Sequence, residues 1–205
     1  MDMQKTVLIL AGGKSLRFQY SDKCFISLNN KPLLKHVIDC VSNVADEIIV
    51  AARDEKQGEQ IRDVIDNKEI RLVFDSVKGF GPLAGILSGF EQATYSYALV
   101  IGCDMPFVNG KAVEFLFEVA ATGYDAVVPR WDNGMVEPLH AVYRREPMLG
   151  AIRVAEKTGD KKIFEILSYL KKVEFLSVNQ LKVIDPNLKT FMNINTPDEL
   201  KRSQI

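Results

Sequence analysis

The chain has 205 residues, of which 47% are hydrophobic and 26% charged, and its formal net charge is −1. Residues 1–205 are sufficient for one domain with a substantial core, and we expect a single domain. The balanced charge excludes the strong basic field of a typical nucleic-acid-binding or membrane-surface protein, so we expect neither partner. No apolar run is long enough to span a bilayer. The N-terminal residues lead directly into a strand, which leaves no room for a signal peptide.

The cysteines of the chain indicate a reducing compartment. They are three in number, Cys24, Cys40 and Cys103, and none forms a Cys-x-x-Cys pair. An odd, scattered set favours neither a disulfide framework nor a zinc site. We therefore expect a cytoplasmic protein.

Apolar and amphipathic segments alternate along the first 130 residues. The patterns predict strands over residues 6–10, 47–51, 71–74, 97–101 and 125–128. They predict helices over residues 32–44, 55–66, 82–94 and 111–121, with Pro32 in the first turn of the first helix. This rhythm is typical of an α/β protein with three α/β/α layers and a mainly parallel, Rossmann-like sheet.

The pattern changes after residue 130. A turn signal at residues 132–134 precedes a strand over residues 135–143, which we expect to return antiparallel. Helices over residues 148–156 and 161–170 and a strand over residues 173–176 follow. Near the C-terminus, Thr196, Pro197 and Glu199 have the spacing of a capping box at the start of a last helix.

The loop after the first strand carries the strongest functional signal. Gly12 and Gly13 follow the apolar run, and Lys14, Arg17 and Lys23 come next. Ligands of open α/β sheets bind at the carboxyl ends of the strands, and bare backbone N–H groups with nearby cations suit a polyanion such as a nucleoside triphosphate. The spacing fits neither a P-loop nor the dinucleotide-binding fingerprint. The alternative is an ordinary turn with solvated cations; the concentration of glycines and cations favours function.

Two aspartates follow later strands. Asp104, in the segment CDMP after residues 97–101, suits Mg²⁺, which usually takes one or two carboxylates together with phosphates and waters. The alternative, an N-cap for the helix over residues 111–121, fails because Asp104 lies too far upstream. Asp75, followed by glycines that include Gly81 and Gly85, could accept hydrogen bonds from a purine edge or a ribose hydroxyl. A plain loop leading into a proline-initiated helix explains that segment equally well.

Asn193 and Asn195 form the last polar pair. Two amides two residues apart on a strand would point to the same face and could meet phosphate, metal-bound water or a second substrate. On the residues alone, strand-end capping is the preferred interpretation. The two histidines, His36 and His140, are interpreted as packed side chains rather than ligands or bases.

Taken together, these motifs resemble the nucleotidyltransferases of the glycosyltransferase-A-like fold, also called nucleotide-diphospho-sugar-transferase-like, and most closely the molybdenum cofactor guanylyltransferase family. The matching segments occur in order over nearly the whole chain: LAGGKSLR (10–17), DK (22–23), NKPL (30–33), DS (75–76), GPLAG (81–85), CDMP (103–106), PLHAVY (138–143) and FMNINTP (191–197).

The resemblance implies a set of substrates and roles. The substrates and cofactor are GTP, Mg²⁺, and molybdopterin or molybdenum-molybdopterin, and the further partners are molybdenum cofactor insertion proteins and molybdoenzymes. The implied roles are backbone contacts to the nucleotide from Leu10, Ala11, Gly12 and Gly13; side-chain contacts from Lys23 and Asp75; Mg²⁺ and nucleotide binding by Asp104; phosphate contacts from Arg17; the nucleotide-side wall at Gly81 and Gly85; and the pterin side or intervening phosphates at Asn193 and Asn195.

The resemblance also implies a base selector, and the chain departs from the family pattern in places. Cytidylyltransferases of this fold usually carry Ala-Ala-Gly where this chain has Ala-Gly-Gly, so the missing Cβ at Gly12 favours a purine. The family's Arg-Met-Gly is replaced by Arg-Phe-Gln at residues 17–19. Its asparagine-containing stretch after the second strand is Ala-Ala-Arg here, at residues 51–53, and no nucleotide contact is carried over to it.

Three other interpretations stay open at this point. A sister enzyme could transfer a cytidylyl group to the pterin, or a nucleotidyl group to a sugar or lactate phosphate. A non-catalytic module could bind nucleotide or pterin without turnover. A generic α/β scaffold with decorative loops is the third, and the ordered motifs disfavour it.

Overall fold

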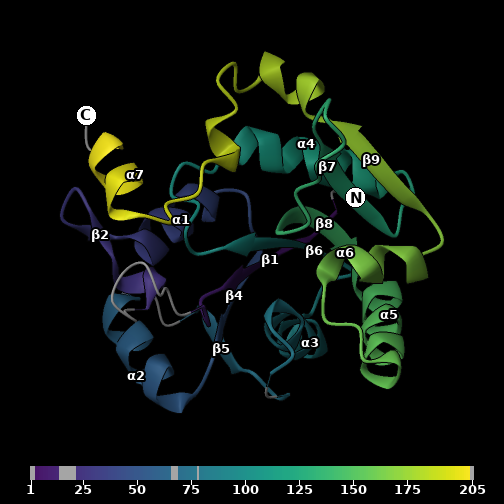
Figure 1. The fold of residues 1–205 in the computed structure, drawn as a ribbon, viewed down its shortest axis with the longest axis horizontal. Helices are drawn as coiled ribbons and strands as arrows, with labels where there is room; N and C mark the ends of the chain where they lie inside the picture. The colour runs from purple at the N-terminus through teal and green to yellow at the C-terminus, as the bar shows by residue number, and fades with distance from the viewer. Residues whose placement is uncertain (1–2, 14–21, 66–68, 78, 204–205) are drawn as a thin grey trace.

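The computed structural model describes residues 3–13, 22–65, 69–77 and 79–203, and its centre is a seven-stranded sheet (Figure 1). The strand order is β5-β4-β1-β6-β8-β7-β9. Among these strands β8 alone runs antiparallel to the others, pairing with β6 and β7. The mainly parallel sheet with one antiparallel strand is therefore confirmed. The strands are β1 (Lys5–Leu10), β4 (Glu47–Ala52), β5 (Arg71–Phe74), β6 (Tyr97–Gly102), β7 (Ala126–Arg130), β8 (His140–Arg144) and β9 (Val173–Ser177).

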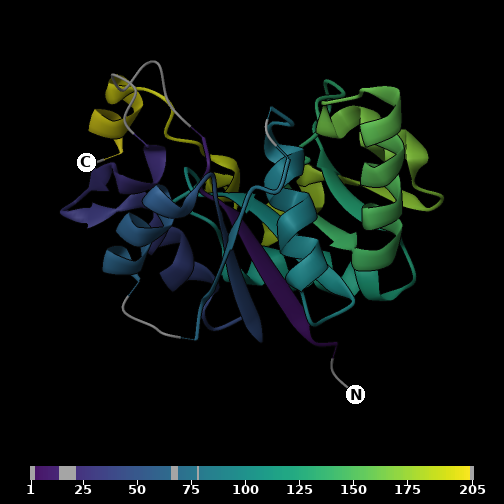
Figure 2. The ribbon, with the colours of Figure 1, turned by 90° about the horizontal axis from the view of Figure 1, so that it is seen from below.

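Helices cover both faces of the sheet and complete the expected three layers. One face packs against α1 (Leu33–Val41), α2 (Glu55–Val64) and α4 (Gly110–Ala121). The other packs against α3 (Pro82–Gln92), α5 (Arg145–Thr158) and α6 (Ile163–Ile166). Figure 2 shows α3 and α5 side by side on one flank of β1, with α1 and α2 on the opposite flank. No helix among the described residues is long and apolar enough to cross a membrane.

Short elements complete the chain. A small hairpin pairs β2 (Ser27–Leu28) with β3 (Lys31–Pro32). The 3₁₀ helices are η2 (Lys23–Phe25), η3 (Leu167–Tyr169), η4 (Val178–Val183) and η5 (Lys189–Phe191), and α7 (Pro197–Arg202) lies near the C-terminus.

Burial on both faces explains why the central strands are apolar throughout. In β1, Val7 and Ile9 belong to the cluster under α1, α2 and α4, whereas Leu8 belongs to the cluster under α3 and α5. A strand covered on both sides has no solvated face and therefore shows no alternation of polar residues.

Four local predictions were wrong. The strand expected over residues 135–143 starts only at His140, because Pro138 has no N–H to donate to a ladder; Val136 forms an isolated bridge with Arg130. Pro32 is the extended N-cap residue of α1, with ψ 144°, and not its first turn. The helix expected over residues 161–170 is the short α6 followed by η3. Residues 192–195 form no strand.

The sheet topology identifies one edge as the natural ligand site. From β1 the chain moves through α1 to β4 on one side, while β6 pairs with β1 on the other. Crevices at such a switch point, beyond the carboxyl ends of parallel strands, are where open α/β sheets bind ligands.

Candidate active site

A cavity of about 730 Å³ lies beyond the carboxyl ends of β1, β4, β5 and β6. Its volume falls within the range of small-molecule sites, about 300–1,000 Å³. Its walls consist of Leu10, Gly12, Gly13, Lys23, Ala51, Arg53, Asp54, Asp75, Val77, Gly79, Gly81, Pro82, Ala84, Gly85, Gly102, Cys103, Asp104 and Leu139.

An ion pair occupies one end of this cavity. Lys23, the first residue of η2, donates from Nζ to Oδ2 of Asp104 at 2.7 Å and to Oδ1 of Asn195 at 2.5 Å. The side chains of Lys23 and Asp104 are 19% and 20% exposed, so the pair is largely withdrawn from water. Three distant parts of the chain therefore meet at one ammonium group.

The backbone beyond the strand ends fixes the position of Asp104. The N–H of Cys103 donates to the carbonyl of Leu10 at 3.1 Å, which extends the β1–β6 pairing one step past Gly102. A Cβ on Gly102 would lie 2.5 Å from Oδ1 of Asp104. Glycine at this position is therefore what lets the carboxylate fold back against the end of β6.

A second carboxylate, Asp75, stands at the other end of the cavity. Its N–H donates to the carbonyl of Ala52 at 3.1 Å, so the residue directly continues β5 beside β4. Burial raises the pKa of the Asp75 carboxyl, and the charge of Arg53 opposes that rise. A Cβ on Gly12 would lie 3.5 Å from Oδ2 of Asp75, and one on Gly85 would lie 3.4 Å from Oδ1. A side chain at either glycine would therefore contact this carboxylate and reduce the space beside it.

The entry to α3 depends on glycine for its backbone. Gly81 is the N-cap residue of α3 and has φ 60° and ψ −141°, a conformation that other residues avoid. Pro82 then opens the helix at its first position. The N-terminus of α3, the end of the helix that favours negative charge, borders the cavity.

Comparison with known proteins identifies the family. The model of the MobA-like NTP transferase domain matches residues 7–173. The chain belongs to this family. It is accordingly a nucleotidyltransferase, and the cavity at the strand ends is its candidate active site.

Full-length relatives agree with the assignment to the MobA-like family. A probable molybdenum cofactor guanylyltransferase of Methanosarcina mazei is 37% identical over 96% of this chain and 88% of its own length. The crystal structure of molybdopterin-guanine dinucleotide biosynthesis protein A from Archaeoglobus fulgidus is 32% identical, with a TM-score of 0.83 over 97% of this chain and 96% of that one. The structure of 4-diphosphocytidyl-2C-methyl-D-erythritol synthase from Anaerococcus prevotii, 18% identical, shares the fold, with a TM-score of 0.72 over 98% and 95% of the two chains.

The structure of this family member brings most of the expected site residues together. The cavity wall includes Leu10, Gly12, Gly13, Lys23, Asp75, Gly81, Gly85 and Asp104. Asn195 is not part of that wall but contacts Lys23 directly. Their roles toward a ligand stay predictions.

Other expected residues lie elsewhere. Ala11 is fully buried beneath the wall, and its carbonyl accepts from the side chain of Gln57. Asn193 is exposed, and residues 192–195 do not form the strand that would have placed it on one face with Asn195. Arg17, with Lys14 and the Phe-Gln pair at 18–19, lies outside the described residues.

Arg53 is the main residue that sequence reasoning missed. It follows β4, and it lines the cavity together with Ala51 and Asp54. The signal was available, since β4 ends at the same edge as β1 and β6. Because this chain lacks the family's asparagine at residues 51–53, no nucleotide contact was expected there and Arg53 was overlooked.

Proposed function

We propose that the chain transfers GMP from GTP to the terminal phosphate of molybdopterin or molybdenum-molybdopterin, forming molybdopterin guanine dinucleotide and releasing pyrophosphate. The observation that carries this proposal is the cavity with a cation–carboxylate pair at one end and a separate, half-buried carboxylate, Asp75, at the other. The end with the Lys23–Asp104 pair suits a triphosphate, and the end with Asp75 suits a base that carries N–H donors. The names of the relatives supply the acceptor.

Asp75 would recognise the nucleoside. An ionised carboxylate is an acceptor only, so it suits the adjacent N–H groups of a guanine edge or a pair of ribose hydroxyls. A Cβ on Gly12 would lie 3.5 Å from this carboxylate, so a side chain at this position would narrow the space beside Asp75. This geometry supports the view that Gly12 helps to admit a purine.

Lys23 and Arg17 would stabilise the leaving group. The acceptor attacks the α-phosphorus through an oxygen of its phosphate monoester, whose second pKa of about 6 leaves it largely ionised at neutral pH without a general base. The bond from the α-phosphorus to the bridging oxygen of pyrophosphate then breaks, and negative charge grows on the pyrophosphate. Fixed cations aimed at that charge lower the barrier, and the ordered cavity positions the two reactants.

Asp104 would hold Mg²⁺. Within the described residues no group of three or more His, Cys, Asp or Glu side chains could hold a metal by itself. One carboxylate facing a phosphate site is nevertheless a usual arrangement for Mg²⁺, because phosphate oxygens and waters complete the shell, and Asp104 fits this role. The bound ion would supply charge neutralisation at the phosphates.

The proposal is tested by pyrophosphate release with molybdopterin as the acceptor. GTP, CTP, ATP and UTP are compared, each with and without Mg²⁺. We expect release with GTP and Mg²⁺ only. Preference for CTP would make the chain a cytidylyl-transferring sister enzyme. Tight GTP binding without any release, despite a competent acceptor, would make it a nucleotide-binding module and would refute the proposal.

A further inference from the structure

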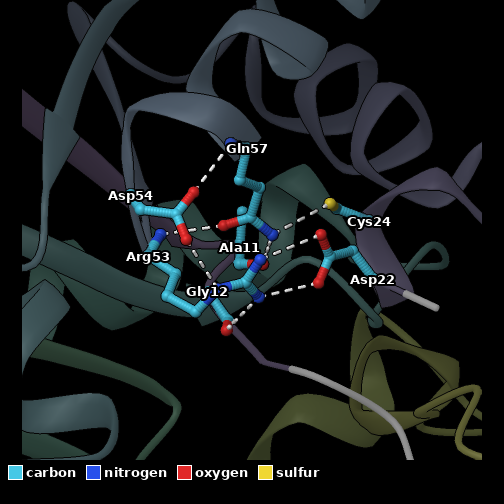
Figure 3. A network of polar contacts seen from close by, with 7 residues as sticks. All are labelled: Ala11, Gly12, Asp22, Cys24, Arg53, Asp54 and Gln57. Carbon is cyan, nitrogen blue, oxygen red and sulfur yellow. Dashed lines mark hydrogen bonds and ion pairs between the residues drawn. The ribbon is translucent and has the colours of Figure 1, made fainter. Parts of the chain in front are cut away.

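Arg53 joins two segments that the sequence separates by nine residues (Figure 3). Its Nη1 donates to the carbonyl of Gly12 at 3.4 Å and to Oδ1 of Asp22 at 2.8 Å, and its Nη2 donates to Oδ2 of Asp22 at 3.3 Å. Gly12 lies two residues beyond the end of β1, and Asp22 precedes Lys23. One guanidinium group therefore fixes the distance between the start of the glycine-rich loop and the residue before the active-site lysine.

Hydrogen bonds through Gln57 hold the backbone of Arg53 in place. Its backbone N–H donates to Oε1 of Gln57 at 2.8 Å, and Nε2 of Gln57 donates to the carbonyl of Ala11 at 2.9 Å. Gln57 is 1% exposed, and Asp54 caps α2 by accepting from the N–H of Gln57. A buried amide that satisfies both its donor and its acceptor is costly to displace, so the end of β1 and the start of α2 move as one body.

The Arg53–Asp22 pair is stronger than an ordinary surface ion pair. It is a two-pronged contact, and the side chains are 28% and 13% exposed. Paired donors of a guanidinium group on one carboxylate fix direction as well as distance. Asp22 is covalently next to Lys23, whose ammonium group reaches Asp104 and Asn195. Orientation can thus pass from Arg53 through Asp22 to Lys23.

We propose that Arg53 is a positioning residue that acts through Asp22 to hold Lys23 against Asp104. The kinetic consequence of this inference rests on the nucleotidyl transfer proposed above; its structural part does not. Without the clamp, Lys23 loses its fixed place at the phosphate end of the cavity while its charge is retained. Transfer then slows even though Lys23 and Asp104 are both still present.

The structural part is tested by the reactivity of the lysines toward acetic anhydride, followed by peptide mass spectrometry. Lys23 is shielded by two partners, so we expect slow acetylation in the unaltered protein and several-fold faster acetylation in Arg53→Gln and in Asp22→Asn. Asp104→Asn gives the rate for a Lys23 that has lost its ion pair but keeps Asn195, and exposed Lys111 is the internal reference. An unchanged Lys23 rate in both clamp variants would overturn the proposal.

The kinetic part is tested by a double-mutant cycle of Arg53→Gln and Asp22→Asn. We expect each single variant to lower kcat/KM on the order of 10- to 100-fold, mainly through kcat, and the double variant to lose little more than either single one. Additive losses would refute an action of Arg53 through Asp22. Arg53→Gln also removes a charge near Asp75, so Asp22→Asn is the cleaner arm.

Two further variants guard against trivial explanations. Arg62→Gln removes an exposed arginine of α2, the helix that follows Arg53, and should change neither the acetylation of Lys23 nor kcat. Arg53→Lys keeps the positive charge but not the two-pronged contact of the guanidinium group, so it should retain only part of the activity that Arg53→Gln loses. It also replaces Arg53→Gln in these tests if the glutamine variant does not fold. Faster Lys23 acetylation in a protein that releases no pyrophosphate would refute the proposed function and leave the clamp standing.

Discussion

Asp104 and Asp75, two of the carboxylates that line the cavity, differ in what balances their charge. Asp104 is already paired, at 2.7 Å, with the ammonium group of Lys23. Asp75 lies near the charge of Arg53, but burial outweighs that charge and raises its pKa; within the described residues the structure records no hydrogen bond to its carboxylate. The charge of Asp104 is thus neutralised by Lys23, whereas the carboxylate of Asp75 is free to accept hydrogen bonds from a ligand. This contrast is the reason for proposing that the Asp104 end binds the phosphates and the Asp75 end the nucleoside.

Removing Asp104 should have the largest effect. In Asp104→Ala we expect Mg²⁺-dependent pyrophosphate release to fall by roughly 10³-fold, because the carboxylate that would hold the metal is gone. Lys23 is partly exposed and keeps Asn195 as a partner, so the protein should stay folded, with circular dichroism as the check. Full activity in this variant would contradict the metal assignment and remove the difference between the two ends.

The loss of Lys23 should act on the same end, less severely. We expect Lys23→Ala to weaken GTP binding by about 10- to 100-fold, since a hydrogen bond to a charged group contributes about 1.5–3 kcal/mol. Isothermal titration calorimetry gives the affinity without requiring turnover. Lys111→Ala, an exposed change outside the cavity, is the matched control. An unchanged affinity would remove Lys23 from the nucleotide site.

Strand order explains why so much of this site could be predicted from sequence. Except for Lys23, the wall residues expected from the sequence lie at or beyond the ends of β1, β5 and β6 or at the start of α3. They lie close together because the carboxyl ends of parallel strands meet at one edge of the sheet. The fold class followed from the alternation of apolar and amphipathic segments. Arg53 also lies at this edge, beyond the carboxyl end of β4. It was missed because the prediction looked for an asparagine that the chain lacks.

The C-terminal residues could not be predicted in the same way. The argument for Asn193 and Asn195 needed a two-residue period, and the irregular backbone of residues 192–195 removes that period. Asn195 reaches Lys23 through a contact 172 residues away in the chain, and Gln57 reaches Ala11 across 46 residues. Neither contact leaves a local pattern in the sequence, because both arise only when the elements pack.

Asp75 offers a sharper test of the contrast, since binding and stability should change in opposite directions. Asp75→Asn should weaken GTP binding by about 10-fold or more, because a carboxylate acceptor is lost. It should also stabilise the free protein, because a partly buried charge is replaced by a neutral amide. A gain of about 1 kcal/mol would raise Tm by roughly 2–4 °C in a chain of this size. A lower Tm would show that Asp75 is structurally paired after all.

The pH dependence of GTP binding should report on Asp75. Its folded-state pKa is raised, so the carboxylate takes up a proton at a higher pH than an ordinary aspartate does. GTP affinity that depends on the ionised form is therefore present at neutral pH and falls as the pH drops through the raised pKa. GTP itself titrates in acid, so the informative quantity is the difference between the unaltered protein and Asp75→Asn, measured by calorimetry. Parallel curves would contradict a role for the ionised form.

The smallest effect should come from the C-terminal support of the Asp104 end. Oε2 of Glu199 accepts from the N–H of Asn195 at 2.7 Å and from that of Thr196 at 3.1 Å, and the capping box is complete. Glu199→Ala removes a cap of about 1 kcal/mol and loosens Asn195, so kcat/KM should fall about five-fold. Asp198→Asn, an exposed change in the same turn, is the control. A loss as large as that of Asp104→Ala would mean that Asn195, and not the ion pair, chiefly holds Lys23 in place.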